Sequence, residues 1–214
     1  MSMNATIHRA VGRDLTRFQN ALDAFVDGDR ARAADLHRAW TNFDNQLTEH
    51  HQGEHAIAWP ALNALGIAES TIDTFDAEHE AMAAELATTG DAMTRLRSSA
   101  TRSDANLAAA AMARLQVATM THLDHEEAET EGPLTQRASD PAVKKMSSQF
   151  SRRSGPVKAG TFFAWMQDGA SPGELSALRA HVPGPVLLML GGVFGRRYRR
   201  QVASVWARPH GAGG

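Results

Sequence analysis

The feature that most constrains the fold is a repeated apolar spacing in the first 140 residues. Apolar residues recur there at alternating steps of three and four along four segments, and β-branched residues are sparse. The first segment carries Val11, Leu15, Phe18, Leu22 and Phe25 at this spacing. Such spacing places the apolar side chains along the seams at which helices pack side by side. The sequence therefore predicts an all-α fold for this region.

Short breaks separate the four segments. Residues 27–29 (Asp-Gly-Asp), Gly66 and the polar run 98–103 stand between successive helices. Short connections favour antiparallel neighbours, so we expect an up-down-up-down antiparallel four-helix bundle. Pro60 follows Trp59 late in the second helix, and it should kink or loosen that helix, because proline cannot donate a backbone hydrogen bond.

Five polar residues occupy seam positions that are normally apolar: His8, His50, Glu54, His79 and His122. A single seam histidine is usually a satisfied core residue, but burying five polar groups without a shared partner is costly. Residues at equal distances from a hairpin turn lie at the same height. In all three hairpins the midpoints between these residues fall in or beside the predicted turn, which places the polar groups in one layer.

The spacing of these residues suits a metal site. His50 with Glu54, and His122 with Glu126, are four residues apart, so each pair lies on one helix face. If both carboxylates bridge, each of two metals receives two imidazoles and two oxygens. A shared oxo or hydroxo group would leave one open position. Such ligands suit iron, and manganese or zinc as well. The chain has no Cys, which excludes disulfides and thiolate ligands.

The formal net charge of −2 hides a division of the chain. Residues 1–141 carry 22 acidic and 11 basic residues, whereas residues 142–214 carry 2 acidic and 11 basic ones. We therefore expect a bundle over residues 1–138, a linker over 139–160 and a basic helical extension over 161–214, with one longer helix at 185–206. The extension should pack on the bundle, basic against acidic, and limit access to the site. A membrane-surface or nucleic-acid role for it is a weaker alternative.

The residues that carry the polar layer lie in a recognisable pattern. Ile7-His8-Arg9 is followed by His50-His51-Gln52-Gly53-Glu54 with Trp59-Pro60, then Glu78-His79, and finally residues 122–127 (His-Leu-Asp-His-Glu-Glu) before Pro133. Over about residues 5–135 the sequence resembles the hemerythrin-like (HHE cation-binding) family. The two His-x-x-x-Glu blocks, each with a trailing proline, are the specific part of the pattern.

The resemblance implies a four-helix bundle around a non-heme, usually di-iron, site that binds or reacts with dioxygen, nitric oxide or peroxide. Four seam histidines rather than five suggest the bacterial type. The implied ligands are His8, His50, Glu54, His79, His122 and Glu126. Residues expected to support these ligands from outside are His51, His55, His125 and Glu127. The pattern leaves open whether Glu126 or Glu127 supplies the carboxylate, and whether His125 turns inward instead of Glu126.

Two functions are compatible with this pattern. The first is a di-iron protein that binds small oxidants or consumes peroxide or nitric oxide, for example in oxidative or nitrosative stress defence. The second is a metal- or oxygen-sensing regulatory or interaction module without catalysis. A ferritin-type site is disfavoured, because no His has a Glu three residues before it. A metal-free bundle would leave the polar seams unexplained.

The expected partner is a small diatomic ligand or peroxide, and no nucleic acid is expected. The pattern leaves the oligomeric state open. Nothing reads as a signal peptide or a membrane-spanning stretch, so a cytoplasmic location is expected.

Overall fold

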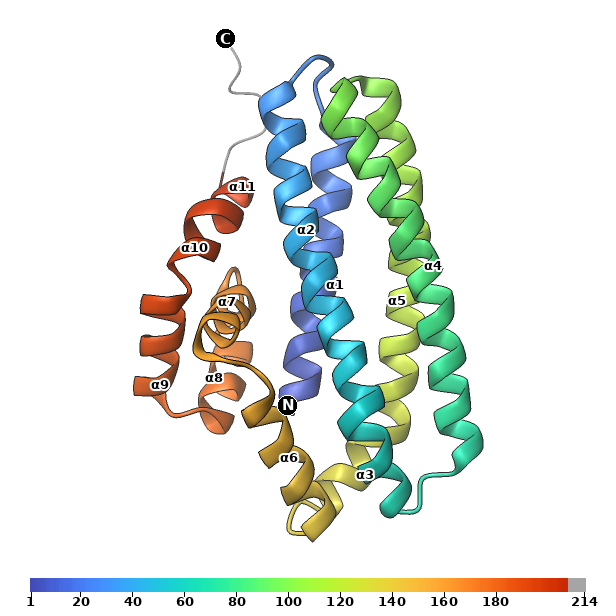
Figure 1. Ribbon diagram of the computed structural model, residues 1–214, viewed down its shortest axis with the longest axis vertical. Helices are drawn as coiled ribbons and strands as arrows, with labels where there is room; N and C mark the ends of the chain where they lie inside the picture. The colour runs from blue at the N-terminus through green and yellow to red at the C-terminus, as the bar shows by residue number, and fades with distance from the viewer. Residues whose placement is uncertain (208–214) are drawn as a thin grey trace.

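The computed structural model describes residues 1–207, and this part of the chain contains helices and turns but no strand. Four long helices lie side by side in Figure 1: α1 (Met3–Asp23), α2 (Arg30–Gly53), α4 (Glu69–Ser99) and α5 (Arg102–Gln136). Helix α1 packs against α2 and α5, and α4 packs against the same two helices. The connections between successive long helices lie at alternating ends of this group of four helices (Figure 1). The predicted all-α class is confirmed.

The helix ends lie close to the predicted breaks, for local reasons. The side chains of Ser2, Asp29 and Thr101 each accept a hydrogen bond from a backbone N–H in the first turn of α1, α2 and α5. Gly28 and Gly66 have φ of 83° and 85°, a conformation that side chains with a Cβ adopt at a cost. These residues define the starts of α1, α2 and α5 and the turns before α2 and α4.

The apolar seam residues form two clusters. Along the length of the helices, the polar layer lies between these clusters. The larger cluster includes Phe18, Phe43 and Leu86, and the smaller one includes Trp59 and Phe75. On α4, for example, the polar position 79 stands between Phe75 and Leu86. The layer is therefore enclosed by apolar packing on both sides, which excludes water and strengthens electrostatic interactions inside.

The second predicted helix is interrupted before its proline. A π-helical turn, η1 (Glu54–Ala58), separates α2 from the short helix α3 (Trp59–Ala64), and the Trp59 N–H donates to the carbonyl of Glu54, five residues back. Pro60 provides no N–H for the regular pattern, so the helix widens by one residue. The predicted local loosening at Trp59-Pro60 is present, and it begins at a candidate ligand, Glu54.

The carboxyl-terminal part is helical throughout most of its described length. It consists of α6 (Pro141–Arg153), α7 (Pro156–Gln167), α8 (Pro172–His181), α9 (Gly184–Met189), η2 (Leu190–Phe194), α10 (Arg196–Tyr198), η3 (Arg199–Ala203) and α11 (Ser204–Trp206). Segment 139–160, expected as a linker, thus contains α6 and the start of α7. Asp140 caps α6, and Pro141 fits its first turn. The single helix expected at 185–206 is divided by two π-helical turns. Residues 208–214, the end of the expected extension, lie outside the described residues.

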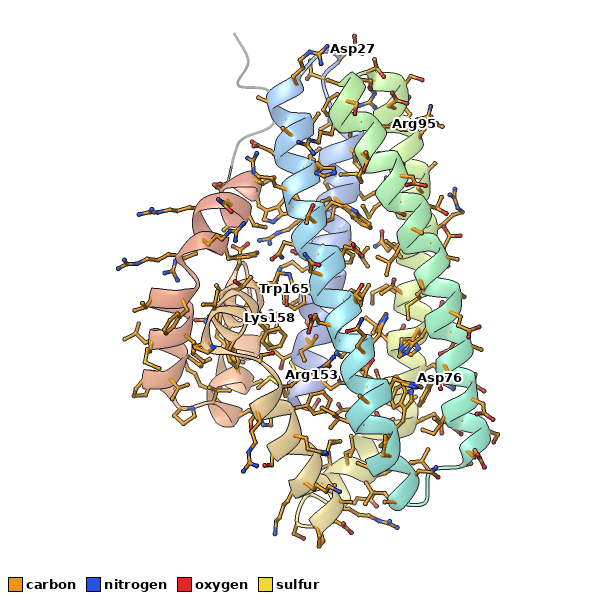
Figure 2. The ribbon with its side chains drawn as sticks, viewed as in Figure 1. Asp27, Asp76, Arg95, Arg153, Lys158 and Trp165 are labelled. Carbon is orange, nitrogen blue, oxygen red and sulfur yellow. The ribbon has the colours of Figure 1, made fainter. Side chains whose placement is uncertain are left out.

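The extension packs along α1 and α2, and a buried polar contact anchors it. Trp165 of α7 is fully buried, and its Nε1 donates to Asp14 Oδ2 at 2.8 Å. Arg17 of α1 bridges Asp14 and Asp168, and the Tyr198 hydroxyl donates to Asp168 Oδ2 at 2.9 Å. In Figure 2, Trp165 lies between the extension and the bundle. At this contact the arginine comes from the bundle and one acid from the extension, the reverse of the expected basic-against-acidic arrangement.

A second contact follows the expected charge order. Lys158 Nζ lies 2.8 Å from Glu49 Oε1, and Arg153 donates to the Glu49 carbonyl at 2.8 Å.

No single helix among the described residues is long and apolar enough to cross a membrane. One pair, Pro172–His181 with Gly184–Phe194, meets the length and composition criteria together, but it is bent by 112°.

Candidate metal centre

The polar layer brings two groups of potential metal ligands together. The first group is His8, His50, Glu54 and Glu126, and the second is His51, Glu54, His79 and His122. Within each group, one side-chain nitrogen or oxygen per residue lies within 4.8 Å of the others. Helices α1, α2, α4 and α5 and the turn η1 all contribute. All six ligands expected from the sequence are among these residues.

In the first group, nitrogen and oxygen atoms face one another at short range. His8 Nε2 lies 3.2 Å from Glu126 Oε2, and His50 Nε2 lies 2.9 Å from Glu54 Oε1. Glu54 and Glu126 are 2% and 3% exposed, so both carboxylates are removed from water. The Glu126 side chain belongs to this group, whereas the side chain of His125 is 35% exposed.

In the second group, His79 Nε2 and His122 Nε2 are 3.0 Å apart, and His79 Nε2 lies 3.5 Å from Glu54 Oε2. The ring of His51 stacks on the ring of His79 at 4.1 Å. The two oxygens of Glu54 therefore face different groups, Oε1 the first and Oε2 the second. The Glu54 carboxylate is thus common to both groups.

Six of the candidate ligand atoms lack an aligned hydrogen-bond partner. Among the buried atoms with no aligned partner are Nε2 of His8, His50 and His51, both oxygens of Glu54 and Oε2 of Glu126. Buried polar atoms are nearly always satisfied, because desolvation without a partner costs several kcal/mol per group. Six such atoms directed into one buried space fit metal coordination, which would satisfy them together.

Carboxylates outside the two groups contact the Nδ1 atoms of His8 and His122. His8 Nδ1 lies 2.8 Å from Glu127 Oε1, and His122 Nδ1 lies 2.8 Å from Glu78 Oε2. Glu78 Oε1 also lies 2.9 Å from His125 Nδ1. A carboxylate at Nδ1 keeps the proton there and leaves Nε2 free to bind a cation. Glu127 thus contacts a candidate ligand directly, whereas His125 is linked to His122 through Glu78.

Asn4 provides a further outer contact, because its Nδ2 donates to Glu126 Oε1 at 3.1 Å. Sequence reasoning missed Asn4 and the supporting position of Glu78. For Glu78 a signal was available, since it stands directly before His79 and one turn before Met82 on the same helix.

His55 does not adjoin the ligands. Its side chain is 72% exposed and lies 3.3 Å from Asp76 Oδ1, which accepts a hydrogen bond from Trp59 Nε1 at 2.8 Å. Trp59 in turn stacks on His79, with ring centroids 5.6 Å apart. Figure 2 places Asp76 on α4 beside the side chains inside the bundle. His55 therefore contacts the site only through Asp76 and Trp59.

Burial and neighbouring charges shift the pKa values of the site residues in different directions. Burial lowers the pKa of His50 and of His79 to about 3, helped by positive charge on His8 and His122 respectively. Burial alone would also lower the pKa of His8, but the adjacent carboxylates of Glu126 and Glu127 raise it to about 9. Burial and the charge of Glu126 raise the pKa of Glu54 well above its usual value. Without a cation, a proton therefore neutralises Glu54, and protonated His8 supplies a positive charge beside Glu126 and Glu127.

His51 is the main difference from the sequence-based expectation. It was expected outside the ligands, but its Nε2 belongs to the second group and has no hydrogen-bond partner. Helix α2 packs against both α1 and α4. Consecutive residues on its inner face therefore point to different neighbours, His50 toward His8 of α1 and His51 toward His79 of α4.

A surface groove adjoins the first group. It has a volume of about 510 Å³, lies between α1 and α5, and is lined by residues that include His8, Arg9, Arg13, Met120 and Glu127. Because His8 and Glu127 lie in its wall, the groove connects the edge of the first ligand group with the surface.

Comparison with known proteins agrees with this geometry. The family model for the hemerythrin HHE cation-binding domain matches residues 5–131. The match includes every residue of the two ligand groups. Neither a curated protein nor a solved structure matches the chain. The matched region spans more than half of the sequence, and the chain belongs to the hemerythrin HHE cation-binding family.

Proposed function

We propose that this protein is a non-heme di-iron protein that binds or reacts with a small oxidant such as dioxygen, nitric oxide or peroxide. The observation that carries the proposal is the position of Glu54, whose two oxygens face two separate groups of nitrogen and oxygen ligands. A shared carboxylate is useful only if two cations lie beside it. Imidazole and carboxylate ligands in the absence of thiolate suit iron, and manganese or zinc could occupy the same donors.

In this proposal His8, His50, Glu54 and Glu126 hold one ion, and His51, Glu54, His79 and His122 hold the other. This assignment differs from a symmetric site with two bridging carboxylates. Glu126 Oε1 accepts a hydrogen bond from Asn4, so only Oε2 is directed toward the first ion. The up-down-up-down order of the helices is part of the proposal, and it is supported by connections at alternating ends (Figure 1).

When bound, iron would supply the redox chemistry and the coordination position for the oxidant. The chain itself does the rest. Glu127 and Glu78 hold protons at Nδ1 of His8 and His122, and thereby orient Nε2 inward. The two apolar clusters exclude water. The groove beside His8 provides a route by which a small molecule could approach the first ion.

The extension is proposed to limit access from the opposite side. Gly53, directly before Glu54, lies against Phe150 and Arg153 of α6, so this helix covers the backbone of the ligand-bearing segment. Replacing Phe150 with Ala should speed the binding of nitric oxide to the reduced metal-loaded protein in stopped-flow measurements. An unchanged rate would show that α6 does not control access.

The same contact favours the second candidate function, a metal-sensing module. Arg153 binds the carbonyl of Glu49 on the turn that precedes His50 and Glu54, so a change in metal occupancy could reach α6. Limited proteolysis separates the two candidates. A sensor should change its cleavage sites within 139–160 on metal removal and should not consume peroxide, whereas a catalyst should consume it.

The test of the central proposal is metal analysis of protein purified without added metal, together with its visible spectrum. Two irons per chain and a charge-transfer band would support a di-iron centre, whereas no metal or a single zinc would refute it. Ala at His79 should lower the metal content far more than Ala at His37, a partly exposed histidine of α2 outside both groups. The substitution Glu54→Gln should lower the occupancy of both ions, whereas His51→Ala should lower the occupancy of only one.

A further inference from the structure

The outer face of the extension carries an unusual combination of exposed side chains. On α9 and η2 the exposed apolar residues are Leu188 at 77%, Met189 at 51%, Val193 at 55% and Val186 at 36%. Arg196, Arg197 and Arg200 follow on α10 and η3 and are exposed as well. We call the segment 184–206 the rod. The spacings of four, three and four residues between positions 189, 193, 196 and 200 place these residues on one side of it. We refer to these seven residues as the outer stripe.

The fold fixes the direction in which the outer stripe points. The opposite side of the same segment is buried, with Leu187, Gly191, Tyr198 and Val202 directed toward the rest of the protein. Gly195 lies so close to α7 that an added Cβ would stand 2.6 Å from the Cβ of Ala164. The rod cannot rotate about its axis without losing this packing. Figure 1 shows α9 on the side of the extension that faces away from the bundle, whereas η3 and α11 pack against α2.

The charge of the outer stripe is unbalanced. Residues 175–214 contain no Asp or Glu. Within the described part of the chain, none of Arg196, Arg197 and Arg200 forms an ion pair; Arg197 donates to Gln201 instead. The acidic bundle therefore does not neutralise these arginines, although it carries most of the carboxylates of the protein. The stripe is complementary to an anionic surface.

We propose that the outer stripe docks this protein on the surface of a bilayer that contains anionic lipids. Exposed Leu, Met and Val side chains can enter the boundary between headgroups and acyl chains, while adjacent arginines bind lipid phosphates and carboxylates. The segment Gly184–Phe194 is far shorter than the roughly 20 residues needed to span a bilayer, so it lies on the surface.

Two other anionic or apolar partners fit the stripe less well. Nucleic-acid binding would use the arginines but leaves four aliphatic side chains without a role, and no exposed aromatic ring is present in the stripe for base stacking. A symmetric contact between two copies would bring the two arginine clusters together, which like-charge repulsion disfavours. A lipid surface uses both halves of the stripe at once.

The test is sedimentation of the full-length, metal-loaded protein with vesicles. We expect binding to vesicles with about one third phosphatidylserine, little binding to pure phosphatidylcholine, and weakening by salt. Each arginine near an anionic surface is worth about fivefold in partitioning, so the triple variant R196Q/R197Q/R200Q should bind roughly 100-fold more weakly. The variant L188S/M189S/V193S should also lose binding, since it removes the inserted side chains.

Matched variants on the bundle control for general charge and hydropathy. R95Q/R97Q/R114Q removes three exposed arginines, and L107S/V117S removes exposed apolar residues that are 52% and 69% exposed. Both should bind vesicles like the parent protein. Helical content and metal content should be unchanged in all four variants, because every altered side chain is exposed.

Several results would overturn the proposal. One is no sedimentation with anionic vesicles at low salt. Another is an equal loss of binding in the bundle control variants. Binding of duplex DNA or formation of a dimer that depends on the outer stripe, without vesicle binding, would assign the surface to a different occupant.

Discussion

Replacement of Glu78 tests whether a residue outside both ligand groups controls one metal ion. Glu78 accepts from Nδ1 of His122 at 2.8 Å and from Nδ1 of His125 at 2.9 Å. The first contact fixes the ring of His122 with Nε2 directed at His79. Loss of such an outer carboxylate typically lowers metal affinity by about 10- to 100-fold.

Because Glu78 makes two contacts, two variants should show losses of metal affinity of different size. In Glu78→Gln the amide oxygen can still accept from one histidine, so we expect a loss of about tenfold, or about 1.4 kcal/mol. In Glu78→Ala neither histidine keeps its acceptor, and we expect about 100-fold. Only the ion proposed to bind His51, Glu54, His79 and His122 should be affected, because Glu78 contacts His122 of that group.

The assay is dialysis of the loaded protein against increasing chelator, with the metal per chain measured by mass spectrometry. The two Glu78 variants should release one ion at lower chelator concentration and the other at the same concentration as the parent. Glu80→Gln is the matched control, since Glu80 is an exposed carboxylate on the same helix. Equal release from the parent and from Glu78→Ala, or parallel loss of both ions, would refute the reasoning.

Three further predictions concern stability, each measured by urea unfolding. Trp165→Phe removes the buried hydrogen bond to Asp14 and should cost about 2–4 kcal/mol, whereas a change under about 0.5 kcal/mol would show that this bond does not anchor the extension. Gly53→Ala places a Cβ 2.8 Å from Cε1 of Phe150, and the shift of α6 side chains should cost roughly 1 kcal/mol; an equal or higher stability would contradict the close packing. The protein from which a chelator has removed the metal should be most stable near pH 6.5, and an unfolding free energy that does not change with pH would refute this. His50, with its pKa lowered to about 3, contributes stability that is lost as pH falls below 6.5, and His8, with its pKa raised to about 9, contributes stability that is lost as pH rises above 6.5.

Much of the bundle and of its polar layer could be predicted from the sequence. Helical periodicity is a local property, so the seam positions of Phe18 and Leu47 identify the faces that pack. Turn residues such as Gly28 and Gly66 act locally as well, and the turns set the register of each hairpin. Register then places residues distant in the chain, such as His8 and Glu126, at one height.

The carboxyl-terminal region was harder to predict for a physical reason. Ser, Lys and Arg at 139–160 are compatible with either a linker or a helix, and helix α6 gains its position from contacts with η1 and α3. The orientation of the extension depends on one buried contact, Trp165 with Asp14, between residues 151 positions apart. Nothing in the local sequence specifies such a pairing.

The sequence by itself determined the helical class, the heights of the candidate ligands and the nitrogen and oxygen chemistry available to the candidate site. Only the tertiary structure decided how the ligands divide into two groups. His50 and His51 are neighbours in the chain, but α2 packs between α1 and α4, so their side chains reach different groups. Glu54 stands at the first residue of a π-helical turn, and its carboxylate is shared between them. Periodicity specifies which face of a helix is buried, whereas the partner of each side chain on that face depends on how the neighbouring helices are placed around it.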